Sequence, residues 1–273
     1  MFRHLSQTKV DELLALFDRH VGELSASAHG SDFDASYYTK HRDRFLAILE
    51  RLPVFSPCET ALELGATDFF QVALGQALDC KTTIGTIFSS RVEDKYYKRP
   101  VSIGAHHVQN LTLSVDLESD ILPLGASSVD FVLCSEVIEH LDIDPMFMLG
   151  EINRVLRLDG YMMVTTPNAC SARNFWKIAH GYRPHFFMQY ERSRSPYRHN
   201  IEYDTHAIRQ MAEAAGFEVE QLETKDVFEP SLNESLDFLR RAHLPLEDRG
   251  DCIFLVARKK SPVIDRWPTG IYV

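Results

Sequence analysis

The feature that most constrains the fold of this chain is a regular alternation of two hydrophobic patterns between residues 60 and 166. Short apolar runs of strand length are separated by segments whose apolar residues recur every three or four positions, as on one face of a helix. Such alternation is typical of a parallel β-sheet with helices on both faces. The runs are TALEL (60–64), TTIGTIF (82–88), LTLSV (111–115), FVLC (131–134) and YMMVTT (161–166).

Helical patterns precede this alternation. Apolar residues recur with helical spacing over 10–24 and again over 38–52, and a polar break of turn-forming residues separates the two segments. We therefore expect residues 1–55 to form an N-terminal helical cap on the α/β domain.

The pattern after residue 166 differs from the alternation before it. Residues 170–200 are aromatic, basic and irregular, which is typical of a lid or acceptor-binding segment. A helix over 204–215, a strand over 217–222 and a final strand over 252–259 follow. The predicted fold is α/β, a doubly wound and mostly parallel seven-stranded sheet whose last strand is antiparallel. Its expected divisions are the cap (1–55), the α/β domain (56–260, with 170–200 inserted) and a C-terminal tail (261–273).

The charge and composition of the chain limit the classes of partner that we expect. The formal net charge is −10 and no run of 18 apolar residues occurs, so we expect neither nucleic-acid binding nor a membrane span. Without an apolar leader segment we expect a cytoplasmic protein whose partners are small molecules or proteins. The cysteines lack a C-x-x-C pair and are expected to be reduced thiols: Cys58, Cys80, Cys134, Cys170 and Cys252.

Several motifs fall in order at the ends of the predicted strands. They are ALELGATDFF (61–70), VDLES (115–119), LPLGASSVDFVLCSEVIEHL (122–141), EINRVLRLDGYMMVTTPN (151–168) and, further on, HNIEYDTHAIRQMAEAAGFEVEQLE (199–223). This ordered set resembles the class I S-adenosylmethionine-dependent methyltransferase superfamily, of the UbiE and UbiG type (methyltransferase type 11). The resemblance implies a Rossmann-like methyltransferase fold with S-adenosylmethionine as the cofactor.

The resemblance also assigns cofactor-binding residues. Glu63 would meet the ammonium group of the cofactor, and Gly65 and Ala66 would form the loop against its methionine part. Asp116 would bind the adenine amino group, beside Leu117 on the ring. Ser135 and Glu136, after the fourth strand, complete the expected set. The alternative for Glu63 and for Asp116 is a buried structural acid held by neighbouring backbone.

Catalytic candidates follow the fourth strand, where members of this superfamily place groups near the acceptor. His140 is a candidate base because an imidazole has an ordinary pKa near 6.5. Glu139 precedes it, and His199 opens the later HNIEY motif. A hydrogen-bonded structural histidine is the alternative for His140. We expect no metal site, and the pair His106-His107 lacks a spaced thiolate or carboxylate partner.

The cofactor motifs depart from the superfamily pattern in two places. The glycine-rich loop keeps only Gly65, and Thr67 and Phe69 occupy the later glycine positions. The second strand ends in Ile87 or Phe88, where relatives carry an acid for the ribose hydroxyls, although Ser89, Ser90 or water could replace it. The expected function is O-methylation of a small-molecule, sugar or glycan-linked hydroxyl. The alternative is a catalytically inactive methyltransferase-fold protein that serves as a binding or scaffold subunit.

The aromatic segment allows two interpretations. Its rings suit either a lid over the acceptor or the contact surface of a homodimer. Its arginines either bind a phosphate of a nucleotide-linked sugar acceptor or form a basic strip that is exposed to solvent. The residues concerned are Trp176, His180, Tyr182, His185, Phe186, Phe187, Tyr190, Tyr197 and His199, with Arg192, Arg194 and Arg198.

Overall fold

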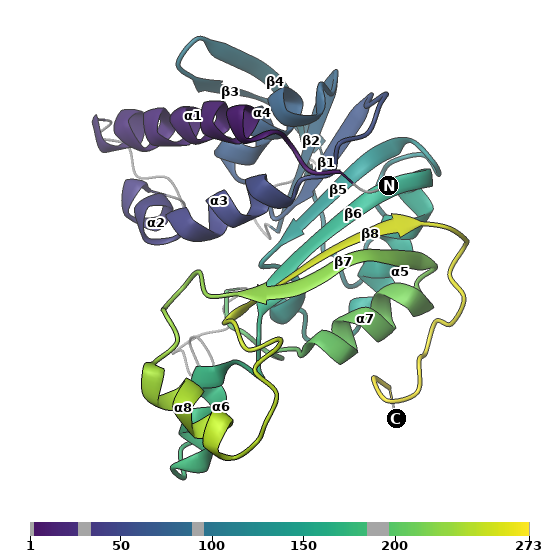
Figure 1. Cartoon of the computed structure of the whole chain (residues 1–273). Helices are drawn as coiled ribbons and strands as arrows, with labels where there is room; N and C mark the ends of the chain where they lie inside the picture. The colour runs from purple at the N-terminus through teal and green to yellow at the C-terminus, as the bar shows by residue number, and fades with distance from the viewer. Residues whose placement is uncertain (1–2, 27–33, 89–95, 185–196, 273) are drawn as a thin grey trace.

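A single sheet forms the centre of the protein, in a computed structural model that describes residues 3–26, 34–88, 96–184 and 197–272 (Figure 1). Its strands lie in the order β3-β4-β2-β1-β5-β6-β8-β7. Strands β4, β2, β1, β5 and β6 are parallel to one another, and β3, β7 and β8 join through antiparallel pairs. The bounds are β1 (Thr60–Leu64), β2 (Thr82–Ile87), β3 (Tyr96–Ile103), β4 (His106–Ser114), β5 (Val129–Ser135), β6 (Leu156–Pro167), β7 (Phe217–Lys225) and β8 (Cys252–Lys259).

The chain reverses its direction of winding between β1 and β5. From β1 it builds outward through β2 to β4, and it then returns to place β5 on the other side of β1. In open sheets of this kind, ligands bind at such a switch point, beyond the carboxyl ends of the parallel strands. The edge at which β1, β2, β4, β5 and β6 end is called the carboxyl edge below.

Helices cover both faces of the sheet (Figure 1). One face carries α1 (Gln7–Ala26), α2 (Ala35–Lys40), α3 (Arg42–Arg51) and α4 (Asp68–Leu78), and the other carries α5 (Pro145–Val155) and α7 (Thr205–Ala214). Each face has its own apolar core: Phe17, Phe45 and Phe69 lie in the first, and Met148, Ile152 and Met211 in the second. The expectation of a doubly wound α/β protein with N-terminal helices is confirmed.

Local sequence explains where the helices that follow the site strands begin. Thr67 caps α4, and its hydroxyl accepts the amide of Phe70. Asp144 caps α5 in the same way, and Pro145 fills the first turn, where a missing amide costs nothing. Both caps lie close to the carboxyl edge, so the helix starts that frame the site are fixed by side chains.

The sheet has one strand more than predicted. Strand β3 is a charged outer strand that, among the described strands, pairs with β4 alone, and it contains Pro100. Proline is tolerated at a sheet edge because an edge strand leaves amides unpaired. Residues 170–200 are not wholly irregular, because α6 (Ala172–Ala179) opens them, and α8 (Asn233–Arg241) was not predicted.

A disulfide corrects the expectation that all cysteines are reduced. Cys58, before β1, is bonded to Cys80, after α4, while Cys134, Cys170 and Cys252 are free thiols. The bond ties the entry of the first strand to the end of the helix that follows it. The fold brings together two cysteines that are 22 residues apart, a pairing that their spacing did not reveal.

Two peripheral features complete the fold. Helices α6 and α8 pack together beyond the carboxyl edge through Phe175, Trp176 and Phe238 (Figure 1). The C-terminal tail docks on α5, where Arg266 and the hydroxyl of Tyr272 both bond to Asp144. Among the described helices, none combines the length and the apolar character that crossing a bilayer requires.

Candidate active site at the carboxyl edge

The loop after β1 is a tight turn that needs its single glycine. Gly65 has φ +67°, and a Cβ atom there would lie 2.8 Å from Cγ2 of Val137 in the segment after β5. The amides of Gly65 and Ala66 donate to Thr86 of β2, and the amide of Thr67 donates to Glu63. The loop is therefore held to β2 and β1 by hydrogen bonds and lies close against the segment after β5.

Glu63 lies beneath this loop and is 1% exposed. Its Oε1 accepts the amide and the hydroxyl of Thr67, both at 2.9 Å, and its Oε2 accepts the side-chain amide of Gln71 at 2.6 Å. Burial raises the pKa of Glu63 to about 8, and these hydrogen bonds oppose that rise. Both carboxylate oxygens thus hold the loop in place.

Asp116 and Leu117 follow β4 at the same edge. Both are half-buried, and Leu117 packs on the apolar core. One carboxylate oxygen of Asp116 accepts the amide of Glu118 at 2.9 Å, which closes a short turn. The strand order places this acid two strands away from Gly65, at the carboxyl edge.

Ser135 ends β5 and Glu136 follows it, next to the switch point. Glu136 has φ +54°, a left-handed conformation that is unusual for a residue with a side chain. Its Oε1 accepts the hydroxyl of Thr165 at 2.8 Å, and Ser135 also pairs with that hydroxyl at 3.0 Å. An unusual backbone that is held in place by neighbouring bonds marks a candidate functional position.

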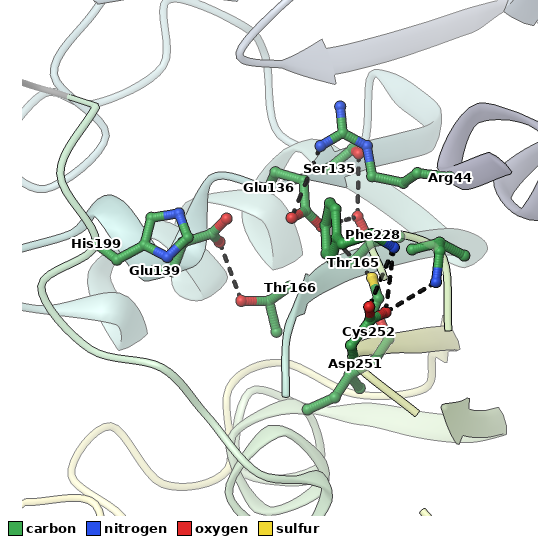
Figure 2. Close-up of polar contacts among 12 residues, drawn as sticks. Arg44, Ser135, Glu136, Glu139, Thr165, Thr166, His199, Phe228, Asp251 and Cys252 are labelled. Atoms are coloured by element: carbon green, nitrogen blue, oxygen red, sulfur yellow. Dashed lines mark hydrogen bonds and ion pairs between the residues drawn. The ribbon is translucent and has the colours of Figure 1, made fainter. Parts of the chain in front are cut away.

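Arg44 of helix α3 extends to this position from the N-terminal helical cap, as Figure 2 shows. One guanidinium nitrogen lies 3.8 Å from Oε2 of Glu136, and another donates to the hydroxyl of Tyr37 at 2.7 Å. Its Nε is buried and has no hydrogen-bond partner among the described residues. Arg44 was not predicted from the sequence, because only the fold brings α3 to the end of β5. The thiol of Cys252 in β8 donates to Oε1 of Glu136 at 3.7 Å. We call Arg44, Glu136, Thr165 and Cys252 the Arg44 cluster.

The three predicted catalytic residues come together. Glu139 and His140 lie in the short helix η1 (Ile138–His140), and one ligand atom from each of Glu139, His140 and His199 lies within 4.8 Å of the others. The rings of His140 and His199 are 5.0 Å apart between centroids. Burial lowers the pKa of His140 to about 4, so its ring is neutral near pH 7. We call Glu139, His140 and His199 the imidazole cluster.

Two consecutive threonines at the end of β6 hold the two clusters. Thr165 donates to Glu136, and Thr166 donates to Glu139 at 3.0 Å. Because successive strand residues point to opposite faces, the two glutamates lie on opposite faces of the sheet (Figure 2). Burial, and then the charge of Glu136, raises the pKa of Glu139. The carboxyl edge therefore carries one polar cluster on each side of β6.

The bulky substitutions in the cofactor loop have structural roles. Thr67 is the helix cap described above, and Phe69 packs among Phe17, Phe45 and Phe70 in the core under the cap. Phe88 is 60% exposed beyond the end of β2.

Part of the predicted aromatic segment can also be placed. The ring of Trp176 in α6 contacts the ring of His180, the residue that caps the end of α6, with 3.9 Å between centroids and a tilt of 45°. Tyr182 and Tyr197 are exposed. The other residues singled out in the sequence lie outside the described part of the chain: Ser89, Ser90, His185, Phe186, Phe187, Tyr190, Arg192 and Arg194.

Comparisons with known proteins agree with this geometry. Residues 58–222 match the family described as "Methyltransferase domain". A methyltransferase solved in complex with the Haloferax volcanii Trm112 methyltransferase activator has a similar fold, with a TM-score of 0.53, 15% identity, and coverage of 92% of this chain and 98% of that one. Phosphoethanolamine N-methyltransferase 1 of Haemonchus contortus, solved with phosphoethanolamine and S-adenosylhomocysteine, also has a TM-score of 0.53 and 15% identity, over 96% of this chain and 51% of that one. A comparison with curated proteins finds no match.

The family match covers more than half of the chain. It includes β1, the turn at Gly65, and β5 with the segment after it that carries Glu136, Glu139 and His140. The order of the strands and the position of the switch point agree with it. The chain therefore belongs to the methyltransferase domain family, and it is an S-adenosylmethionine-dependent methyltransferase with the class I fold.

Proposed function

We propose that the cofactor binds along the carboxyl edge, with its amino-acid end at the Arg44 cluster and its adenine beside Asp116 and Leu117. The methionine part of S-adenosylmethionine carries a carboxylate and an ammonium on one carbon. A buried arginine beside a buried glutamate offers the complementary charges at a matching separation. The unpartnered Nε of Arg44 supports this fit, because a carboxylate would satisfy it.

This arrangement changes one assignment made from sequence. The ammonium group is assigned to Glu136 in place of Glu63, because both oxygens of Glu63 already accept bonds from Thr67 and Gln71. Gly65 and Ala66 then shape the floor of the site through the turn. Asp116 keeps its proposed bond to the adenine amino group, and its second oxygen is the candidate acceptor. Bound S-adenosylmethionine supplies the electrophilic methyl group, and the chain supplies alignment.

The proposed reaction is methyl transfer to a hydroxyl of a small molecule, a sugar or a glycan. The observation that carries this proposal is the imidazole cluster beside the proposed cofactor site. His140 donates from Nδ1 to the carbonyl of Arg198 at 3.1 Å, which leaves the lone pair on Nε2 when the ring is neutral. A neutral imidazole in that orientation accepts the proton that a hydroxyl acceptor loses. Because burial lowers the pKa of His140 to about 4, the ring is a weaker base than an ordinary imidazole, and we expect its contribution at the lower end of the roughly 10²–10⁴-fold range of general bases.

Transfer of a labelled methyl group from S-adenosylmethionine to a panel of sugars and phenols tests this proposal, and mass spectrometry locates the label. We expect label on oxygen, and we expect His140→Gln to lower kcat while cofactor affinity stays unchanged. Label found only on nitrogen would contradict the hydroxyl class. Cofactor binding with no transfer to any acceptor would favour the scaffold alternative.

A further inference from the structure

The imidazole cluster has the donor atoms and the spacing of a metal site. It offers two imidazole nitrogens and one carboxylate oxygen, all within 4.8 Å of one another. Two of the residues are adjacent in η1, and the third comes from the segment before α7. The sequence predicted no metal site, because the spacing of His140 and His199 matches no local ligand motif.

Both histidines are oriented by acceptors on one ring nitrogen. Nδ1 of His140 lies 3.1 Å from the carbonyl oxygen of Arg198, and Nδ1 of His199 lies 3.1 Å from Oε1 of Glu202. Each acceptor places the proton of a neutral ring on Nδ1, and the lone pair therefore lies on Nε2. A carbonyl or carboxylate behind the ring is the usual outer contact of a metal-binding histidine.

Glu139 supplies a third donor that nothing else in the described chain satisfies. Its carboxyl group is fully buried, and Oε2 accepts the hydroxyl of Thr166. Its Oε1 has no hydrogen-bond partner and lies 3.9 Å from Nε2 of His140. Burying an unsatisfied carboxylate oxygen costs stability, and a cation at this point would remove that cost.

Two hydrogen bonds from Asn200 fix the two halves of the cluster relative to each other. The amide of Asn200 donates to the carbonyl of Glu139, and its side chain donates to the carbonyl of His140, both at 2.8 Å. The three donors are therefore held in place before any ion arrives, which lowers the entropic cost of binding.

We propose that Glu139, His140 and His199 hold a divalent first-row transition metal ion, with Zn²⁺ as the representative. Imidazole and carboxylate donors suit this class of ion, whereas Mg²⁺ and Ca²⁺ prefer oxygen alone. Three protein ligands leave a coordination position open, as in metal sites that bind a substrate oxygen. The role of that open position rests on the proposed function: it takes the acceptor hydroxyl, which the cation makes more acidic, so that water takes up the proton. His140 is then a ligand and this role replaces the base role given above, and His140→Gln lowers kcat in either role.

Metal content tests the proposal without cofactor or acceptor. Tag-free protein is stripped with a chelator, equilibrated with Zn²⁺, desalted and measured by mass spectrometry. We expect about one zinc ion per wild-type chain, and affinity lower by at least about 100-fold in His199→Asn and Glu139→Gln. The double variant His106→Asn/His107→Asn removes two exposed histidines from the start of β4 and should retain the ion.

A milder variant covers the case in which a buried substitution prevents folding. Glu202→Gln removes the carboxylate behind His199 and should weaken zinc binding by about 10–100-fold, with unchanged circular dichroism. Co²⁺ in place of Zn²⁺ should give visible absorption bands that the same variants lose. No zinc retained by the wild type, or equal retention by all variants, would overturn the proposal. Methyl transfer is assayed separately, so the absence of bound zinc would contradict the metal site alone, and the proposed function would still be tested by the transfer assay.

Discussion

Arg44 of the N-terminal cap lies with a guanidinium nitrogen 3.8 Å from a carboxylate oxygen of Glu136, at the end of β5. Both side chains are nearly buried, and the Tyr37 hydroxyl and the rings of Tyr37, Phe45 and Phe228 surround the guanidinium. This contact joins a helix at the start of the chain to the switch point of the sheet. The cap therefore contributes a charge to the site as well as apolar cover.

Arg44→Gln should weaken binding of S-adenosylmethionine. Loss of a charged hydrogen bond costs about 1.5–3 kcal/mol, which corresponds to roughly a 10- to 100-fold rise in Kd. Isothermal titration measures that rise. Arg42→Gln, in the same helix but paired with Asp18 at the surface, is the control and should leave Kd unchanged. Equal affinities in both variants would remove Arg44 from the site.

Asp116→Asn should raise the Kd of S-adenosylmethionine about tenfold, because the adenine amino group would lose a charged acceptor. The substitution keeps an oxygen for the turn bond to Glu118, so the fold should persist. Asp142→Asn, at an exposed position nearby, is the matched control. Competition with adenosine sharpens the measurement: adenosine should also bind more weakly to the variant, and unchanged adenosine binding would contradict the assignment.

Two glycine substitutions should have opposite effects on stability. Gly65→Ala combines a positive φ with a Cβ contact of 2.8 Å to Val137, and it should lower the free energy of unfolding by about 1–3 kcal/mol. Gly22→Ala, inside α1 with open space around it, should raise that free energy by about 0.5–1 kcal/mol. Urea denaturation measures both. A neutral Gly65→Ala would mean that the turn relaxes freely.

The protonation of His41, which lies between α2 and α3, should contribute to the pH dependence of stability. Burial, and then the charges of Arg44 and Lys40, lowers the pKa of His41 to about 4 from an ordinary value of 6.5. Between these values the unfolded chain binds more protons than the folded one, so the free energy of unfolding falls as the pH drops from 6.5 toward 4. His41→Gln should lose less stability over that range. Parallel curves for variant and wild type would contradict a half-buried, neutral His41.

The sequence predicted the strands that carry the site because each is a short apolar run with a motif at its end. Parallel strands end at one edge, so Gly65, Asp116 and Glu136 could be brought together without coordinates. Strand β3 was missed because Tyr96–Ile103 mixes charged residues with a proline, a pattern that only its edge position permits.

Contacts between residues that are far apart in the sequence could not be predicted from these patterns. Arg44 meets Glu136 only because α1, α2 and α3 pack on the α4 face, and nothing in the local sequence of α3 marks that arginine. The Cys58–Cys80 bond likewise depends on where β1 begins and α4 ends. His199 was found because it opens a motif, but its closeness to Glu139 comes from two hydrogen bonds of Asn200, one from its backbone amide and one from its side chain.

Hydrogen–deuterium exchange with and without S-adenosylmethionine tests the central claim most directly, because it locates the cofactor on the chain. We expect the cofactor to slow exchange in the turn at Gly65, in the Asp116–Leu117 segment, after β5 at Glu136, and in the α2–α3 region around Arg44. Protection confined to other segments, or no protection at saturating cofactor, would contradict a cofactor site built by the carboxyl edge and the cap together.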